Sequence, residues 1–135
     1  MSGDAALALQ QALYGRLSGD AILAGLVSGV FDHVPDETAF PYVTLGEDAA
    51  TDWSTKTFDG QRHALTLHVW SRARGRTEAK TIMARLYELL HGATFAVAGH
   101  ELILLRFDFS ETRREPDGLT QHGVMRFRAL THPNS

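Results

Sequence analysis

A strand pattern and a helix pattern follow one another directly near the middle of the chain. Between Arg62 and Trp70 apolar and polar residues alternate, which is typical of a strand with one buried face. Apolar residues then recur at helical spacing up to a stop at His91 and Gly92. The block therefore predicts a helix lying on a half-buried sheet. Its inward residues are Leu65, Leu67, Val69, Ala79, Ile82, Met83, Leu86, Leu89 and Leu90.

Two helices are predicted at the amino terminus. Leucines recur at every fourth position from Leu9 to Leu17, so we expect a helix from about Asp4 that either Asp4 or Ser2 caps. Asp20 is placed to cap a second helix that runs to Val27. Together the two segments predict a helical hairpin.

Four further segments are expected to be strands, on the basis of alternation or of β-branched and aromatic residues. The polar, turn-rich segment from Gly46 to Asp59 is expected to be a loop, and a loop of that length in a small domain is usually functional or mobile. The expected strands are Tyr42–Leu45, Thr94–Val97, His100–Glu111 and Leu119–Thr131.

The order of these elements predicts an α+β fold, with a mainly antiparallel sheet and helices packed on one face. A chain of 135 residues matches one domain spanning residues 1–135. Alternation places Ile103, Leu105, Phe107, Phe109, Met125 and Phe127 in the core. The opposite face would gather Thr66, His68, Trp70, Arg106, Asp108, Arg126 and Arg128, together with Leu102 and Leu104.

Composition excludes several classes of function. The chain has no cysteine, which removes disulfides, thiolate metal sites and a cysteine nucleophile. The first residues lack a basic segment, and Gln10, Gln11 and Arg16 interrupt their apolar run, so we expect neither a signal peptide nor a membrane span. Folding in the cytoplasm follows. A net charge of -3 provides no overall basic field for gripping a phosphate backbone.

No pattern of catalysis is present. The seven histidines show no HExxH motif and no helical pairing, and His63 and His68 stand five apart in a strand, hence on opposite faces. No serine lies in a GxSxG elbow, and no glycine-rich loop precedes a helix. The acidic groups lie in turn-rich segments where solvated loops are the ordinary structure. We therefore expect no catalytic residue, no metal and no cofactor.

Two features leave alternatives open. The basic turn through Arg72, Arg74 and Arg76 and the pair Arg113-Arg114 are either solvated turns or a local patch that meets acidic subunits or passing DNA. Trp53 stands in a polar segment, where it either contacts a partner or packs back on its own domain.

Several motifs together resemble the tail-terminator or tail-completion family of long-tailed phages, prophages and gene transfer agents. They are PYVTLGED at Pro41–Asp48, WSTKT at Trp53–Thr57, LHVWSR at Leu67–Arg72, the helix ending LLHG, the turn at Asp117-Gly118 and the strand HGVMRFRA. Their order and spacing carry the likeness, which covers nearly the whole chain.

The resemblance implies a structural subunit of a hexameric ring that caps the tail tube, ends its polymerisation and joins the head connector. It implies no catalytic residue. Expected partners are copies of the chain, the tail tube protein and the connector or stopper protein, with DNA only passing through. The chain would then end up in a phage-like particle. The expected contact residues are Trp53, Lys56, Arg62, Thr66, His68, Trp70, Arg72, Arg74, Arg76, Arg106, Arg113, Arg114, Arg126 and Arg128.

Two other functions compete with this one. A head-tail joining or stopper protein would also be a small ring former. A small ligand-binding or hydrolytic α+β domain would use His68, Arg106 and Arg126 as a pocket on the sheet face.

Overall fold

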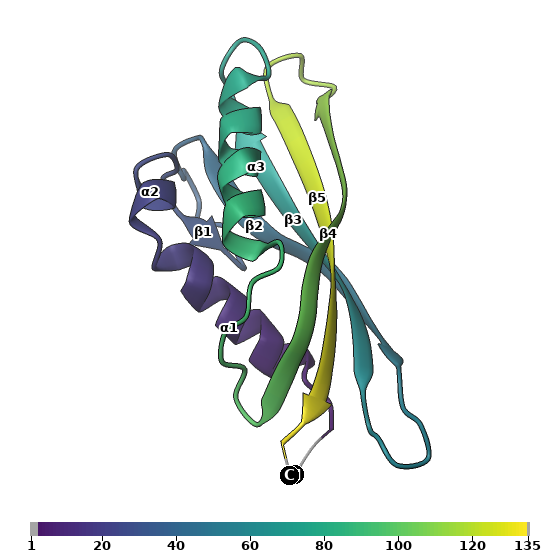
Figure 1. Cartoon of the computed structure of the whole chain (residues 1–135). Coiled ribbons are helices and arrows are strands. Elements are labelled where there is room, and N and C mark those ends of the chain that lie inside the picture. Colours follow the sequence, from purple (N-terminus) through teal and green to yellow (C-terminus); the bar gives the residue numbers. More distant parts are fainter. Residues whose placement is uncertain (1–2, 135) are drawn as a thin grey trace.

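A single sheet backed by helices organises the chain (Figure 1). The computed structural model describes residues 3–134. The helices are α1 (Ala6–Ser18), α2 (Ala21–Ala24) and α3 (Thr77–Leu90), and the strands are β1 (Val30–Phe31), β2 (Tyr42–Asp52), β3 (Gln61–Ser71), β4 (His100–Arg114) and β5 (Gln121–Pro133).

The five strands lie in the order β1-β2-β3-β5-β4, with β1 parallel to β2 and the other neighbours antiparallel. In Figure 1, α1 and α3 lie on the same side of the sheet. The predicted α+β class, the mainly antiparallel sheet and the helices on one face are confirmed. Within residues 3–134 the other side of the sheet carries no helix, and we call it the outer face.

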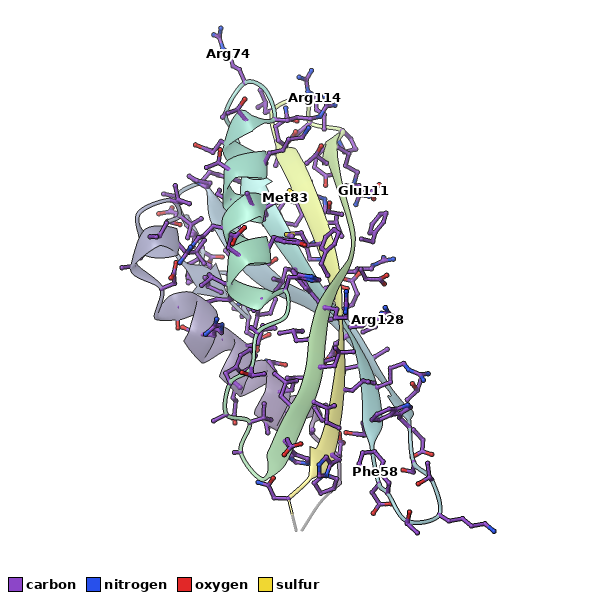
Figure 2. The ribbon with its side chains drawn as sticks, in the orientation of Figure 1. Phe58, Arg74, Met83, Glu111, Arg114 and Arg128 are labelled. Atoms are coloured by element: carbon purple, nitrogen blue, oxygen red, sulfur yellow. The ribbon has the colours of Figure 1, made fainter. Side chains whose placement is uncertain are left out.

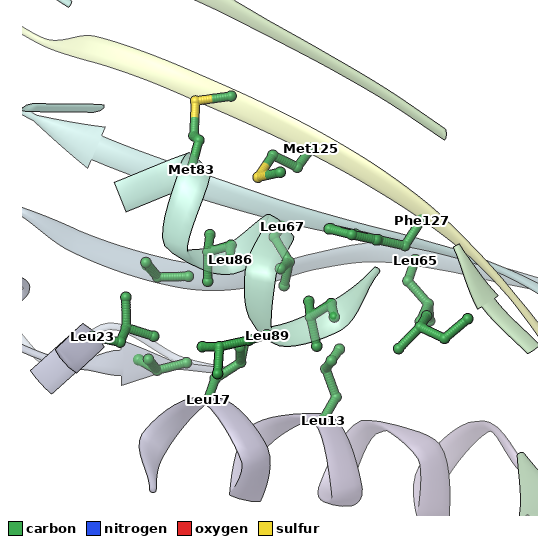
Figure 3. Close-up of a cluster of buried hydrophobic side chains, with 14 of the residues drawn as sticks. Leu13, Leu17, Leu23, Leu65, Leu67, Met83, Leu86, Leu89, Met125 and Phe127 are labelled. Carbon is green, nitrogen blue, oxygen red and sulfur yellow. The ribbon is translucent and has the colours of Figure 1, made fainter. Parts of the chain in front are cut away.

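The core forms between the helices and the inner face of the sheet (Figure 3). The leucine row of α1 and the apolar side of α3 are buried against β3 and β5, as the sequence predicts. Leu67, Leu86 and Leu105 are almost completely buried, and so is Phe127. Burial of side chains of this size stabilises a domain by about 1.5–3 kcal/mol each.

Asp20 caps the second helix, as predicted, because its carboxylate accepts a hydrogen bond of 2.8 Å from the backbone N–H of Leu23. The helix is shorter than expected, however, since it ends at Ala24 and not at Val27. Val27 continues the core from a turn. At the first helix the Asp4 carboxylate accepts from the N–H of Ala6 at 3.1 Å, while Ser2 lies outside the described residues.

The loop predicted from Gly46 to Asp59 is wrong for its first half. There β2 continues to Asp52, paired with β3 past an irregularity between Leu45 and Asp48. Pairing with a long neighbouring strand satisfies the backbone groups of this segment whatever its side chains are, so its polar composition did not reveal the strand. Residues 53–60 form the end of a β-hairpin that projects from the rest of the sheet (Figure 1).

Two irregularities in β4 overturn part of the predicted core. The register shifts between Leu102 and Leu104 and again between Phe107 and Phe109. Each shift inserts one residue and changes which side chains face inward. Leu102 is therefore buried and Phe109 is 40% exposed, the reverse of what strict alternation predicts, and Ile103 is 37% exposed.

The strand predicted from Thr94 to Val97 is absent; only an isolated bridge joins Val97 to His100. A positive φ at Gly99 closes the tight turn between them, which leaves no length for a ladder. The last strand begins two residues later than predicted, at Gln121, because the Asp117 carboxylate accepts from the N–H groups of Leu119 and Thr120 and holds them in a turn.

Candidate assembly surface

The outer face has two parts, set by the register of the strands. One part contains aromatic rings and histidines where the carboxyl end of β3 pairs with the amino end of β5. The other part contains arginines farther along the sheet, on β3, β4 and β5. The side chains of the first part are Tyr42, Thr44, Glu47, His68, Trp70 and His122, and those of the second are Arg62, Arg106, Phe109, Arg126 and Arg128.

Trp70 organises the first part. Its indole stacks on the ring of His122, with 3.9 Å between the ring centres and an angle of 11° between the ring planes. The indole N–H donates to the hydroxyl of Thr44 at 3.1 Å. Trp70 and His122 are direct partners in the register of β3 and β5. Stacking and a satisfied indole N–H therefore hold this aromatic side chain flat on the sheet.

A line of four hydrogen-bonding side chains crosses this part of the face. Oε1 of Glu47 lies 2.8 Å from Nε2 of His68, whose Nδ1 lies 2.7 Å from Nε2 of His122. Nδ1 of His122 lies 2.5 Å from Oε1 of Glu115 in the β4–β5 turn. The bond from His68 favours the ionised form of Glu47 and lowers the pKa of that carboxyl group.

The ends of this line determine which ring nitrogens donate. Ionised carboxylates only accept hydrogen bonds, so the outer nitrogens of both rings must donate. Burial lowers the pKa of His122, although the bond to Glu115 opposes that effect. The Arg113 guanidinium, 3.4 Å from the same ring nitrogen, also disfavours a second proton.

The second part of the face is basic. Arg106 on β4 and Arg128 on β5 are direct cross-strand partners, and both are exposed. The Arg126 guanidinium lies 5.6 Å above the ring of Phe109. Arg62 also lies on this face and is exposed, whereas Thr66 is 6% exposed and offers a partner little surface.

Trp53 packs partly on its own hairpin. Its ring meets Phe58 edge-on at 5.4 Å, and Phe58 in turn contacts the ring of His132 at 5.0 Å. A Cβ at Gly60 would lie 2.8 Å from the Trp53 ring, so a glycine is needed there. The indole remains half-buried, and Lys56 in the same hairpin end is exposed.

The basic turn and the β4–β5 turn lie together at the end of the molecule opposite Phe58 (Figure 2). Arg72 is the anchored member, with its guanidinium 4.4 Å from the centre of the Phe40 ring and its Nε donating to Thr120 at 3.3 Å. Arg113 forms an ion pair of 3.2 Å with Glu111. Arg74, Arg76 and Arg114 at this end are exposed as well.

Several residues at the outer face were not among the predicted contact residues, including His122, Phe109 and, in the adjoining turn, Glu115. His122 and Glu115 were not singled out because they stand seven residues apart, on a strand and a turn, and only strand pairing brings His122 to His68. Phe109 was assigned to the core. The register shift in β4 that exposes it has no marker in the sequence.

The three residues of the suggested hydrolytic pocket belong to different parts of the outer face. His68 is bonded to Glu47 and His122, whereas Arg106 and Arg126 belong to the arginine part of the face. Five surface hollows in the described chain, of about 20 to about 510 Å³, are lined by other residues. No group of three or more histidine, aspartate or glutamate side chains within residues 3–134 could hold a metal ion.

Helices covering one sheet face, and an uncovered face rich in arginine and stacked aromatic rings, define a small subunit built for contact with other proteins. Over residues 11–132 the sequence matches the family model described as "Tail completion protein gp17", and the chain belongs to that family. Among residues 3–134, no helix has the length and apolar character needed to cross a bilayer.

Individual relatives agree with this membership. The chain is 27% identical over 130 residues to "Tail completion protein gp17" of Bacillus phage SPP1, covering 96% of each chain. It superposes with a TM-score of 0.90 and 34% identity on a chain of a structure described as "Virion of native gene transfer agent (GTA) particle", covering 97% of this chain and 99% of the other. The SPP1 gp17 structure matches with a TM-score of 0.61 and 26% identity, over 97% and 92% of the two chains.

Proposed function

We propose that this protein forms a hexameric ring on the end of a tail tube, stops the polymerisation of the tube and provides the surface that joins the head connector. The observation that carries the proposal is the likeness, at a TM-score of 0.90 over 97% of the chain, to a chain of a gene transfer agent virion. The family membership and the helix-free outer face support it.

The action of such a ring is steric. Head-to-tail contacts that close by rotation bury one patch of each subunit against a different patch of the next. A closed ring occupies the growing end of the tube with one surface and presents a non-propagating surface on the other side. The free energy for capping the tube comes from subunit interfaces and not from stabilisation of a transition state. The ring therefore requires no catalytic residue, cofactor or metal.

The two ends of the subunit are suited to different axial partners. Residues 53–60 at the hairpin end include Trp53 and Lys56. Figure 2 shows Arg74 and Arg114 at the end opposite Phe58, and Arg76 belongs to the same turn as Arg74. In the proposed ring, one of these ends meets the tube and the other meets the connector. The chain folds in the cytoplasm before it joins the particle, and DNA passes through the ring without sequence-specific contacts.

Deletion of the gene tests this function. Electron microscopy of the resulting lysate should show overlong tails that are not attached to heads, and supply of the intact chain from a plasmid should restore normal particles. Tails of normal length that lie unattached would identify a head-tail joining protein instead. Normal infectious particles after deletion would contradict any role in completing the tail.

A further inference from the structure

Arg106 and Arg128 face each other directly across β4 and β5 on the outer face, and both are exposed. Like charges directly opposite on neighbouring strands destabilise a sheet. Asp108 on β4 is the nearest acidic residue in sequence to Arg106, yet within residues 3–134 no carboxylate forms an ion pair with either arginine. The isolated subunit leaves this repulsion uncompensated.

Next to this pair, Arg126 lies over the exposed ring of Phe109. The patch thus combines guanidinium groups with an apolar ring, and Figure 2 shows Arg128 on the side of the sheet away from α3. A partner that suits this patch offers a carboxylate for a guanidinium fork and apolar or aromatic walls for the arginine stem.

The opposite edge of the sheet offers such a partner surface. A hollow of about 400 Å³ lies between α1 and β1, and its walls include Tyr14, Phe31 and Leu45. Asp32 also lines this hollow, is exposed, and forms no ion pair within the described chain. Aromatic faces attract guanidinium groups, and a carboxylate at the mouth adds a charge-assisted hydrogen bond.

We propose that the Arg106–Arg128 pair of one copy docks on the hollow around Tyr14, Phe31 and Asp32 of the next copy. This inference rests on the proposed ring and names the contact that closes it. The two patches belong to β4 and to the β1 edge, which are the two outermost strands of the sheet. A head-to-tail ring needs two different, complementary patches in this arrangement.

The second copy of the chain is favoured over DNA as the occupant. The net charge of -3 repels a phosphate backbone, whereas the hollow that Asp32 lines is present once in every subunit. Each copy therefore supplies both halves of the contact, and no further molecule is needed to neutralise the facing arginines.

Engineered cysteines test the contact, and the absence of native cysteine makes the result specific. The chain with both Asp32→Cys and Arg106→Cys should give a ladder of linked subunits when particles are treated with a short bismaleimide. Chains with only one of the two changes are the controls and should give no species larger than a dimer. A double-cysteine chain that assembles into particles but gives no ladder would overturn the proposal.

Charge reversal supplies a second test with two readouts. Arg106→Glu places a carboxylate opposite Arg128, so the isolated subunit should unfold at the same or a higher temperature. The same change should reduce the number of properly terminated tails about tenfold, and Asp32→Arg should do likewise. The chain with both changes should recover termination, while Lys80→Glu, on the exposed side of α3, serves as the matched control.

The outcomes separate this contact from the ring itself. If intact particles carry the protein as a ring at the tube end, and the charge reversals leave termination unchanged, the contact is wrong and the proposed function stands. If the protein is absent from the tube end, the proposed function fails. Binding of labelled duplex DNA that Arg106→Glu abolishes, with termination unaffected, would assign the arginines to DNA and overturn the proposal.

Discussion

Arg85 on α3 donates hydrogen bonds to both carboxylate oxygens of Asp20, from Nη2 to Oδ1 at 2.7 Å and from Nε to Oδ2 at 2.9 Å. The same carboxylate caps α2 through the N–H of Leu23. One side chain therefore joins the amino-terminal hairpin to the helix that covers the sheet. These bonds favour the ionised form and lower the pKa of Asp20 to about 2.

Replacement of Asp20 by Ala should lower the unfolding temperature by several degrees, because the cap and the fork are lost together. A carboxyl group with a lowered pKa stabilises the fold above its ordinary value of 3.8, and this contribution disappears as the pH falls toward 2. The difference between wild type and Asp20→Ala should therefore shrink over that range in thermal melts. A difference that is constant with pH would exclude the ion pair as its source. Exposed Asp36→Ala is the control.

The hydrogen-bonded line through His68 and His122 should make stability depend on pH. Burial lowers the pKa of His122, so the unfolded chain takes up more protons just below the ordinary value of 6.5. The stabilisation is present above 6.5 and is lost as the pH falls through the lowered pKa. Thermal melts from about pH 8 to about pH 5 should show this loss.

Replacement of His122 by Gln should weaken that dependence but leave a remainder, because burial also lowers the pKa of His63. His63 is 2% exposed and bonds to the Thr131 hydroxyl at 2.9 Å on the inner face. His33→Gln, in an exposed loop, is the matched control. An unchanged pH dependence in the His122→Gln chain would contradict the assignment of this dependence to His122.

Gly123 on β5 lets Met83 of α3 approach the sheet. A Cβ at this glycine would lie 2.6 Å from the Met83 sulfur, so Gly123→Ala should destabilise the fold by about 1–3 kcal/mol, the usual cost of overpacking. Met83→Ala in the same chain should remove the clash, because it removes the sulfur that the new Cβ would meet. Denaturant melts of the wild type, the two single variants and the double variant should then show a smaller loss of stability in the double variant than the sum of the two single losses. Additive effects would show that the helix position does not depend on this glycine.

Replacement of Trp53 by Ala should weaken assembly more than folding. The ring is half-buried in a projecting hairpin, where its own contacts are Phe58 and Gly60, so the unfolding temperature should change little. The number of properly terminated tails should fall, because a partly exposed tryptophan is a typical hot spot of an interface. Normal termination with a large loss of thermal stability would assign Trp53 to hairpin packing alone.

Elements with a strong periodicity were predicted well. The helical row that ends at Leu90 and the alternation from Arg62 to Trp70 both match the observed elements to within one or two residues. The polar half of β2 and the inward or outward choice along β4 were predicted wrongly. In both places the structure depends on a neighbouring strand. Pairing with β3 satisfies the backbone of the polar half of β2, and pairing with β5 leaves an extra residue in β4 at each register shift.

Some features of the candidate surface also follow from the sequence, whereas others depend on how the strands pair. That Arg106, Arg126 and Arg128 lie on the helix-free side follows from strand alternation, so the sequence alone was sufficient. That Arg106 stands opposite Arg128, and that His68 bonds to His122, depends on register between strands far apart in the chain.

The sequence by itself therefore determined the fold class, the helices and the charge of the outer face, because periodicity within one segment decides which side chains are buried. Only the tertiary structure decided which side chains meet across strands. Pairing geometry joins positions whose separation along the chain carries no record of the contact.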